Sequence, residues 1–237
     1  MKPLFDLHTH SISSGHAYST ISELTLFAFN NGLSAIGCSD HGPGMPGGAH
    51  PFHFINMTVM PRKLNGVILL RGIEANIMNL NGDLDIEERV LKKVDYAICS
   101  LHTPCIQSGD AEENTDALIS VMTKTNVKII GHPDDPRFPL NYPRLISAAK
   151  AHDIWLEINN SSLRPDTARK NAIINTRILL EECKKQHVTV VLGSDAHYAG
   201  QVGDFSLVMA LIEELAFPES LIANLNIENA FRLVQKD

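Results

Sequence analysis

Short apolar runs alternate with longer amphipathic segments along most of the chain. The runs are rich in Ile, Val, Leu and aromatic residues and end at polar residues, Gly or Pro, which is typical of buried strands. We therefore predict seven strands, at residues 4–10, 35–41, 68–77, 96–102, 127–133, 155–161 and 188–197.

The segments between the runs carry apolar residues three and four positions apart, the spacing of one helix face. Thr20 and Glu23 match a capping box, and Asn114 is a candidate cap for a helix that extends to residue 124. The Gly- and Pro-rich residues 42–54 are expected to form a loop, and Asn81-Gly82 a tight hairpin turn. The other helices are predicted at residues 86–94, 142–152, 168–187, 204–217 and 219–234.

Alternation of strands and helices predicts an α/β fold with a parallel sheet, either open or closed into a barrel. Neither a linker nor a break in composition divides the sequence, so we expect one domain over residues 1–237. With 237 residues, 44% of them hydrophobic, the chain can bury a substantial core unaided. Any metal is therefore expected to serve function rather than folding.

Charge and cysteine content limit the possible binding partners and the expected cellular location. The net charge of −7 and the lack of a Lys/Arg run argue against long nucleic acid as a partner, although a small anionic substrate remains compatible. The four cysteines include no C-x-x-C pair, and Cys38 and Cys99 lie in apolar runs, which favours buried, reduced thiols. Neither a signal peptide nor a membrane span is indicated, so a reducing cytoplasm is the expected location. The sequence is also compatible with a homo-oligomer.

Metal-ligand residue types recur at the ends of six of the seven predicted strands, and one more follows on the first loop. These residues are His8, His10, His16, His41, Glu74, His102, His132, Asp195 and His197. Because the carboxyl ends of parallel strands meet on one face of a sheet or barrel, these side chains should converge there. His8 and His10 are two positions apart and should point to the same side of their strand.

Imidazole and carboxylate groups are ligands that divalent zinc, manganese and iron accept. A lone histidine is more often an ordinary polar residue, and we assign His50, His53, His152 and His187 to that class. Repetition at six strand ends is hard to obtain by chance. Since a catalytic zinc takes about three protein ligands, the nine residues indicate about three ions, with Glu74 as the candidate bridge.

The motifs resemble those of the PHP (polymerase and histidinol phosphatase) domain family over essentially the whole chain. The stretches RGIEAN at 71–76 and EINNS at 157–161 resemble the stand-alone bacterial PHP phosphatases of the YcdX type in particular. The matching motifs are Asp6-Leu7-His8-Thr9-His10, Ser39-Asp40-His41, Gly72-Ile73-Glu74, His102, His132 and Gly193-Ser194-Asp195-Ala196-His197.

This resemblance implies a distorted (β/α)7 barrel with a trinuclear metal centre, usually zinc, with manganese or iron as alternatives. Flanking residues such as Thr103 and Asp134-Asp135 depart from the pattern and bear on substrate preference. The implied ligand sets are His8, His10, Glu74 and Asp195 for one ion, Glu74, His102 and His132 for a second, and His16, His41 and His197 for a third.

Phosphate monoester hydrolysis suits such a centre, with a metal-bound hydroxide as nucleophile and a small phosphorylated substrate. No covalent intermediate is expected. Asp40 is either a group that orients a ligand histidine or a turn residue at a strand end. Arg62, Arg137 and Arg164 are either phosphate clamps or solvated surface charges.

Other functions share part of this pattern. A metal-dependent amidohydrolase also begins with H-x-H and ends with an aspartate, but uses eight strands and usually a modified lysine. Histidinol-phosphate phosphatase shares the same chemistry and is an open alternative. A nuclease role is disfavoured by the acidic balance, and a non-catalytic PHP fold would be expected to have lost ligands.

Overall fold

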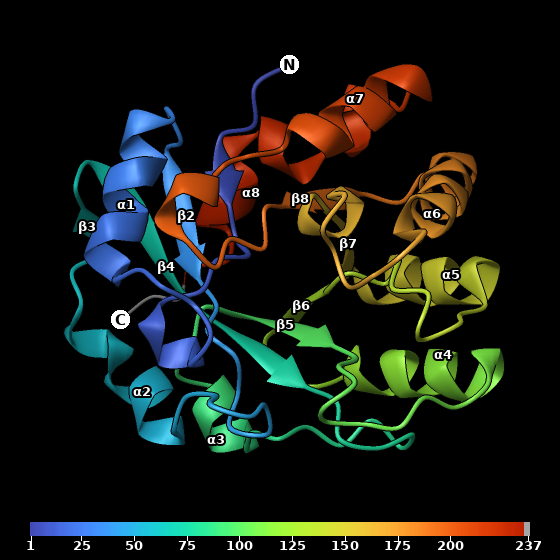
Figure 1. Cartoon of the computed structure of the whole chain (residues 1–237), viewed down its shortest axis with the longest axis horizontal. Helices are drawn as coiled ribbons and strands as arrows, with labels where there is room; N and C mark the ends of the chain where they lie inside the picture. The colour runs from blue at the N-terminus through green and yellow to red at the C-terminus, as the bar shows by residue number, and fades with distance from the viewer. Residues whose placement is uncertain (235–237) are drawn as a thin grey trace.

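A computed structural model describes residues 1–234, and seven parallel strands form its centre (Figure 1). They are β1 (Phe5–Asp6), β2 (Ala35–Cys38), β4 (Val67–Asn76), β5 (Tyr96–Ser100), β6 (Val127–Ile130), β7 (Trp155–Asn159) and β8 (Val190–Gly193). They neighbour one another in this order, every pair parallel. The predicted distorted (β/α)7 barrel is confirmed. A further strand that the sequence did not indicate, β3 (Lys63–Leu64), pairs antiparallel with β4.

Helices surround the strands (Figure 1). The α-helices are α1 (Ile21–Asn30), α2 (Pro51–Asn56), α3 (Glu88–Leu91), α4 (Ala111–Val121), α5 (Tyr142–His152), α6 (Ala172–Gln186), α7 (Ser206–Glu214) and α8 (Ile227–Phe231). Single 3₁₀ turns lie at Ile12–Ser14, Met57–Val59, Ser161–Leu163, Ala199–Gln201, Glu219–Leu221 and Ala223–Leu225. Within residues 1–234, no helix is both long and apolar enough to cross a bilayer.

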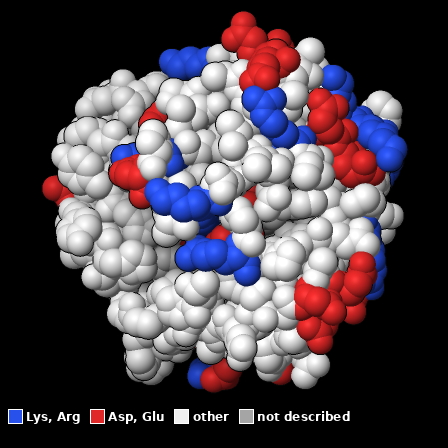
Figure 2. Space-filling view, turned by 45° about the vertical axis from the view of Figure 1, so that its right-hand side comes forward, with Lys and Arg blue, Asp and Glu red and all other residues white. Residues whose placement is uncertain are grey.

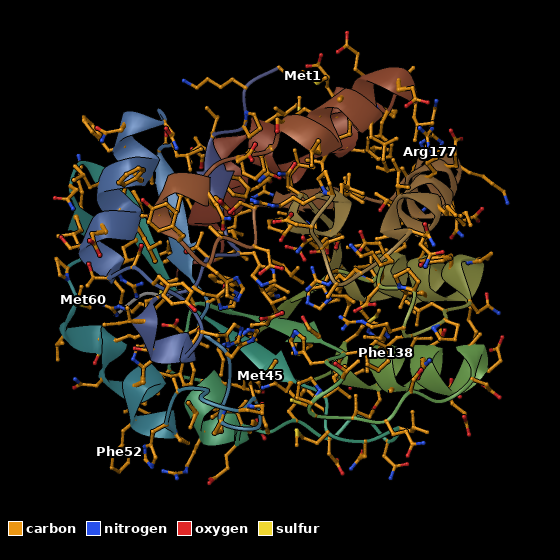
Figure 3. All side chains as sticks on the ribbon, in the orientation of Figure 1. Met1, Met45, Phe52, Met60, Phe138 and Arg177 are labelled. Atoms are coloured by element: carbon orange, nitrogen blue, oxygen red, sulfur yellow. The ribbon has the colours of Figure 1, made fainter. Side chains whose placement is uncertain are left out.

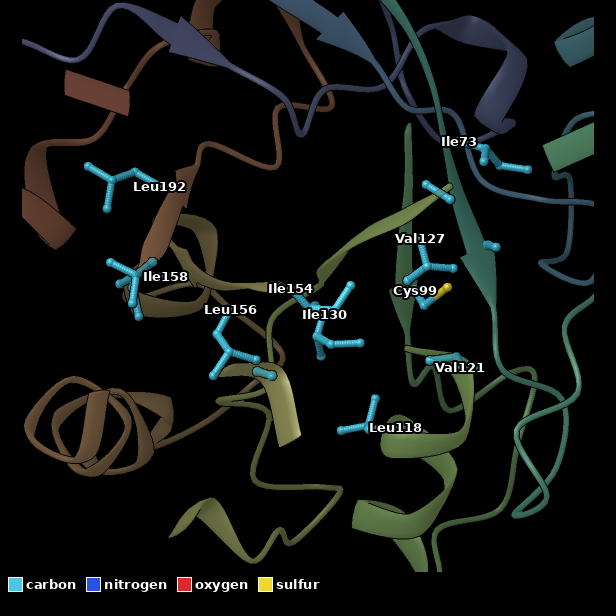
Figure 4. Packing of buried hydrophobic residues seen from close by; sticks show 14 of the residues in the cluster. Ile73, Cys99, Leu118, Val121, Val127, Ile130, Ile154, Leu156, Ile158 and Leu192 are labelled. Atoms are coloured by element: carbon cyan, nitrogen blue, oxygen red, sulfur yellow. The ribbon is translucent and has the colours of Figure 1, made fainter. Parts of the chain in front are cut away.

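The strands are buried on both faces, which explains their continuous apolar runs. Along β5, Tyr96 and Ile98 pack with residues of other strands inside the ring, while Ala97 and Cys99 belong to the layer beneath the helices. Figure 4 shows part of that outer layer, where Leu118 of α4 faces the sheet. Successive side chains of the strand therefore alternate between the inside of the ring and the layer beneath the helices, although the side chains on both faces are apolar.

Several predicted elements match closely. α5 has the predicted bounds, and the capping box of α1 is present, with the Thr20 amide donating to the Glu23 carboxylate at 2.7 Å. The Asn81-Gly82 turn joins an antiparallel bridge between Ile77 and Leu84. Most of the other strands are shorter than predicted, because the polar residues at their ends lie outside the ladder.

Three predictions were wrong in detail. Asn114 does not cap α4: Asp110 does, because its carboxylate accepts from the Glu112 and Glu113 amides. Residues 42–54 are not entirely loop, since α2 begins at Pro51, whose fixed φ suits a first helical position.

The predicted helix at 219–234 is replaced by two 3₁₀ turns and the short α8. Ile222 pairs with Val190 in a parallel bridge, which holds its backbone extended and interrupts the helix. Sequence periodicity contains no information about this long-range pairing.

Asn224 lies two residues after this bridge, and its side chain joins β1 to β8. Its Nδ2 donates to the carbonyls of Phe5 and Leu192 at 2.8 and 2.9 Å, and its Oδ1 accepts from the Leu192 amide at 2.7 Å. At the other end of the gap, a bridge between Thr9 and Ala196 brings the same two strands together. The buried side-chain amide of Asn224 thus connects the amino-terminal parts of β1 and β8, where the two strands form no ladder of their own.

Candidate metal centre

The nine predicted ligands lie together where the carboxyl ends of the strands meet. Glu74 belongs to β4, and the other eight follow five other strands. Seven of the nine are buried, while His16 is exposed and His197 half-buried. Met45, labelled in Figure 3 beside the convergence of side chains, lines the cleft above them.

Glu74 occupies the middle of the cluster. Its Oε1 lies 3.1 Å from His132 Nε2, 3.3 Å from His102 Nε2 and 3.4 Å from His8 Nε2. Ser100 donates its hydroxyl to the same oxygen at 2.7 Å. A carboxylate so surrounded has the geometry to serve more than one cation.

The second oxygen of Glu74 and the carboxylate of Asp195 face another part of the cluster. Glu74 Oε2 lies 2.7 Å from His41 Nδ1 and 3.5 Å from His10 Nε2. Asp195 Oδ1 lies 3.3 Å from His10 Nε2 and 3.6 Å from His8 Nε2. The two carboxylates therefore flank both imidazoles of the H-x-H motif.

His16 completes the cluster on its open side. Its ring stacks at centroid distances of 5.0 Å on His41 and 4.8 Å on His197. Three overlapping groups bring ligand atoms within 4.8 Å of one another: His8, His10 and Glu74; His41, Glu74 and His102; and His10, His41 and His197. These groups overlap with the predicted ligand sets without reproducing them, so the assignment of residues to individual ions stays a prediction.

Four buried atoms of the cluster have no hydrogen-bond partner among residues 1–234: His8 Nε2, His10 Nε2, His41 Nδ1 and Glu74 Oε2. The last two lie 2.7 Å apart, but not in an orientation that makes a hydrogen bond. Buried polar atoms are normally paired, so such a concentration needs an explanation. Nitrogen and oxygen donors left open toward one another fit divalent cations.

The electrostatics differ among the ligands. Burial opposes protonation of His8, but Glu157, Glu74 and Asp195 outweigh it and raise the pKa of His8 well above its usual value, so metal binding there displaces a proton. The other shifts favour ligand-competent protonation states. Burial, together with neighbouring imidazoles, lowers the pKa of His10 well below its usual value, and burial lowers the pKa of His102 to about 4. Burial opposes ionisation of Glu74 and Asp195, but nearby histidines outweigh it and hold the pKa of each carboxyl well below its usual range. Neutral imidazoles and ionised carboxylates are the forms that bind metal.

Groups outside the cluster orient its imidazoles. His8 Nδ1 lies 2.7 Å from Glu157 Oε1, and His102 Nδ1 lies 2.7 Å from Asn76 Oδ1. Both contacts turn the Nε2 atoms inward, the arrangement that fixes the tautomer of a ligand histidine. Sequence reasoning missed Glu157, although a glutamate inside an apolar strand was a signal that it has a buried partner.

Asp40 holds a second set of groups in place. Its carboxylate accepts from the Ser11 amide and the Ser14 hydroxyl, both at 2.7 Å, and from His53 Nε2 at 2.9 Å. Ser14 Oγ in turn lies 3.1 Å from His10 Nδ1. Of the two interpretations of Asp40, the geometry therefore favours the orienting one. His53, assigned to ordinary polar residues, belongs to this network.

Two of the ligand residues have a strained backbone. His132 and Asp195 have φ values of 27° and 54°, in the left-handed region that non-glycine residues rarely adopt. Such conformations cost about 1–3 kcal/mol each and cluster at functional sites. Gly193 also permits a close approach, since a Cβ there would collide with the Glu157 carboxylate.

A cleft of about 350 Å³ opens above the cluster. Five of the ligand residues line it, together with five other side chains. The ligands are His16, His41, His102, Asp195 and His197, and the others are Met45, Arg137, Arg164, Arg169 and Gln201. Arg62, a candidate phosphate clamp, instead pairs with Asp95 next to the amino end of β5. Arg169 was not singled out from the sequence, where nothing local distinguishes it from Arg164.

Arg169 is the arginine nearest the ligands. Its Nη1 lies 3.1 Å from Asp195 Oδ2 and 3.2 Å from Ser162 Oγ. The neighbouring carboxylates, despite burial, raise its pKa further above its ordinary value. A fixed cation therefore stands at the edge of the cluster.

Comparison with known proteins agrees with this geometry, because residues 6–164 match the PHP domain family. The chain belongs to the PHP domain family. Two relatives named as probable phosphatases extend the match beyond residue 164. The PHP chain is 44% identical over 224 residues to one from Clostridium acetobutylicum, covering 94% of this chain and 91% of that protein. It is 46% identical over 229 residues to one from Clostridium botulinum, covering 97% and 93%.

A solved structure shares the PHP fold. The histidinol phosphate phosphatase of Lactococcus lactis, determined with zinc, L-histidinol and phosphate, superposes with a TM-score of 0.62 at 20% identity. The match covers 92% of this chain and 95% of that one. At this identity, the likeness shows the fold alone.

Proposed function

We propose that this PHP protein hydrolyses phosphate monoesters of small molecules, using divalent metal ions bound at the cluster. The observation that carries the proposal is the set of four unpaired, buried ligand atoms at the centre of nine converging ligand residues. Family membership and the relatives named as probable phosphatases support the same activity.

We further propose three ions, with zinc as the expected metal, and the ligand sets that the family motifs imply. Glu74 would bridge the His8–His10 side and the His102–His132 side. Its Oε1 faces His8 as well as His102 and His132, and its Oε2 faces His10. His16, His41 and His197 would hold the third ion. Mixed nitrogen and oxygen ligation suits zinc, and also manganese or iron.

Metal ions at such a site acidify water and neutralise phosphate charge, which is the chemistry that ester hydrolysis requires. The chain's own groups position the reactants. Glu157 and Asn76 fix two imidazoles through their Nδ1 atoms, and Asp40 acts on His10 through Ser14. Arg169, held against Asp195, offers a cation for phosphate oxygens.

The proposed function also indicates the size of the substrate and the cellular compartment of the protein. The substrate is a small phosphorylated molecule that enters a cleft of about 350 Å³, at the lower end of the usual size of small-molecule sites. All four cysteines are free, and three of them are buried. This supports the reducing cytoplasm as the location in which the protein works.

A metal-dependent amidohydrolase is the principal rival. The central sheet has seven parallel strands, and a glutamate occupies the middle of the cluster, both of which favour the phosphatase. A screen of phosphate esters against amides and lactones separates the two. Turnover confined to amides or lactones would contradict the proposal.

The direct test is release of p-nitrophenol from p-nitrophenyl phosphate by metal-loaded protein. Glu74→Gln should lower turnover by at least about 100-fold, since the carboxylate faces five imidazoles. Glu182→Gln, on α6 and away from the cleft, is the matched control and should leave turnover unchanged. Undiminished turnover by Glu74→Gln, or by protein stripped of metal, would overturn the proposal.

A further inference from the structure

The cleft above the cluster is lined by three arginines, although the chain as a whole has a net charge of −7. Figure 2 shows basic side chains gathered near the middle of one face of the molecule. Local cations on an acidic protein concentrate anions at one place. Their arrangement indicates what kind of anion fits.

The three arginines lie at different depths. The side chain of Arg169 is 13% exposed and contacts Asp195 at the floor. The side chains of Arg164 and Arg137 are 34% and 37% exposed and lie further out. A phosphate at the floor therefore meets Arg169, and whatever is attached to that phosphate extends toward the other two.

Arg137 and Arg164 are each held by an aspartate two residues away. The Asp135 carboxylate accepts from Nε and Nη2 of Arg137, at 2.9 and 2.6 Å. Asp166 accepts from Nε of Arg164 at 3.2 Å. In residues 1–234, Nη1 of Arg137 and both Nη atoms of Arg164 make no hydrogen bond. An arginine fixed through its Nε edge presents its remaining N–H groups for a planar anion.

We propose that Arg164 and Arg137 bind a second anionic group of the substrate, so that the preferred substrates are small phosphate monoesters that also carry a carboxylate or another phosphate. The inference rests on the proposed phosphatase function and names its substrate class. A phosphate ester with a neutral or cationic remainder leaves these two guanidinium groups without that partner.

The test compares two substrates that differ at one group, with metal-loaded full-length protein. In 3-phosphoglycerate a carboxylate replaces the terminal hydroxymethyl group of glycerol 3-phosphate. Wild type should favour 3-phosphoglycerate in kcat/KM by about 10- to 100-fold, the value of one or two charge-assisted contacts. Arg164→Gln and Arg137→Gln should each reduce this ratio toward one, chiefly by lowering turnover of 3-phosphoglycerate.

Arg89→Gln is the matched control. Arg89 is also paired side-on with a carboxylate two residues away, Glu87, but it is exposed and does not line the cleft. It should leave both substrates and their ratio unchanged, and metal content should be equal in all variants. Equal wild-type rates on the two substrates would overturn the inference, as would variants that slow both substrates equally, which would make these arginines phosphate clamps. If the wild-type protein still hydrolyses p-nitrophenyl phosphate in a metal-dependent way, either of these results leaves the proposed phosphatase function intact. If it does not hydrolyse p-nitrophenyl phosphate, the proposed function fails as well.

Discussion

Nδ1 of His8 lies 2.7 Å from Oε1 of Glu157, and both side chains are almost wholly buried. The other oxygen of Glu157 accepts from the His132 amide at 2.7 Å. Glu157 thus contacts the ring of His8 directly and holds His132 through the backbone amide of His132. This carboxylate comes from the one predicted strand that supplies no ligand.

Glu157→Gln should weaken metal binding by about 10- to 100-fold, the usual cost of losing such a partner. The amide cannot accept from both the His8 ring and the His132 backbone, because one of its two ends carries only donors. Competition with a chromophoric chelator measures the affinity. Glu182→Gln, on α6, is the control. Equal affinities in Glu157→Gln and wild type would show that Glu157 has no part in holding the ligands.

Asn224→Ala should lower the free energy of unfolding by at least about 3 kcal/mol. The substitution leaves the Leu192 amide and two strand carbonyls unpaired, and each buried polar group without a partner costs about 1–3 kcal/mol. Urea unfolding of metal-free protein gives the value. Asn229→Ala removes one half-buried contact on the same segment and should cost about 1 kcal/mol. Equal losses in the two variants would contradict the closing role of Asn224.

Asp134→Asn should change stability in a pH-dependent way. Burial raises the pKa of Asp134 from 3.8 to about 6, so the folded protein holds this proton more tightly than the unfolded chain. The carboxyl therefore costs stability as pH rises from about 4 to about 6, by about 3 kcal/mol in all. Asparagine bears no such cost, and the hydroxyls of Ser162 and Thr176, which donate to Asp134, can turn to suit it.

Unfolding of metal-free wild type and Asp134→Asn across pH 4–8 provides the check. The two should be similar near pH 4, and the variant should become the more stable as pH rises past 6. A difference that stays constant with pH would contradict the raised pKa.

Removing metal should lower the melting temperature without unfolding the protein. Ligands that bind only the folded state stabilise it by about 4 kcal/mol at a thousandfold excess over Kd. The apolar core beneath the helices is separate from the cluster and should persist. Thermal melts followed by circular dichroism, with and without EDTA, test both statements. A melting temperature that does not change when EDTA is added would contradict the binding of metal to the folded protein.

Much of this architecture was predictable because it is local. Apolar runs and caps specify strands and helices within a few residues, and parallel strands must carry their end residues to one face. His8, Glu74 and Asp195 could therefore be brought together from sequence position alone.

The remainder depends on contacts between distant residues. The helical pattern at residues 219–234 is interrupted because Ile222 pairs with Val190 and Asn224 joins β1 to β8, and no local window reveals either contact. Arg169 resembles other loop arginines until the fold sets it against Asp195. Glu157 was visible in sequence, but its partner, 149 positions away, was not.

The central claim is that nine residues hold three metal ions, and a metal count on His16→Ala tests it most directly. His16 lies on the open side of the cluster and contacts His41 and His197. Removing it should therefore spare the other ligands. Elemental analysis by mass spectrometry should find about three ions per chain in wild type and in the control His152→Ala, and about two in His16→Ala. An unchanged count in His16→Ala, or wild-type protein that binds no metal, would contradict the account.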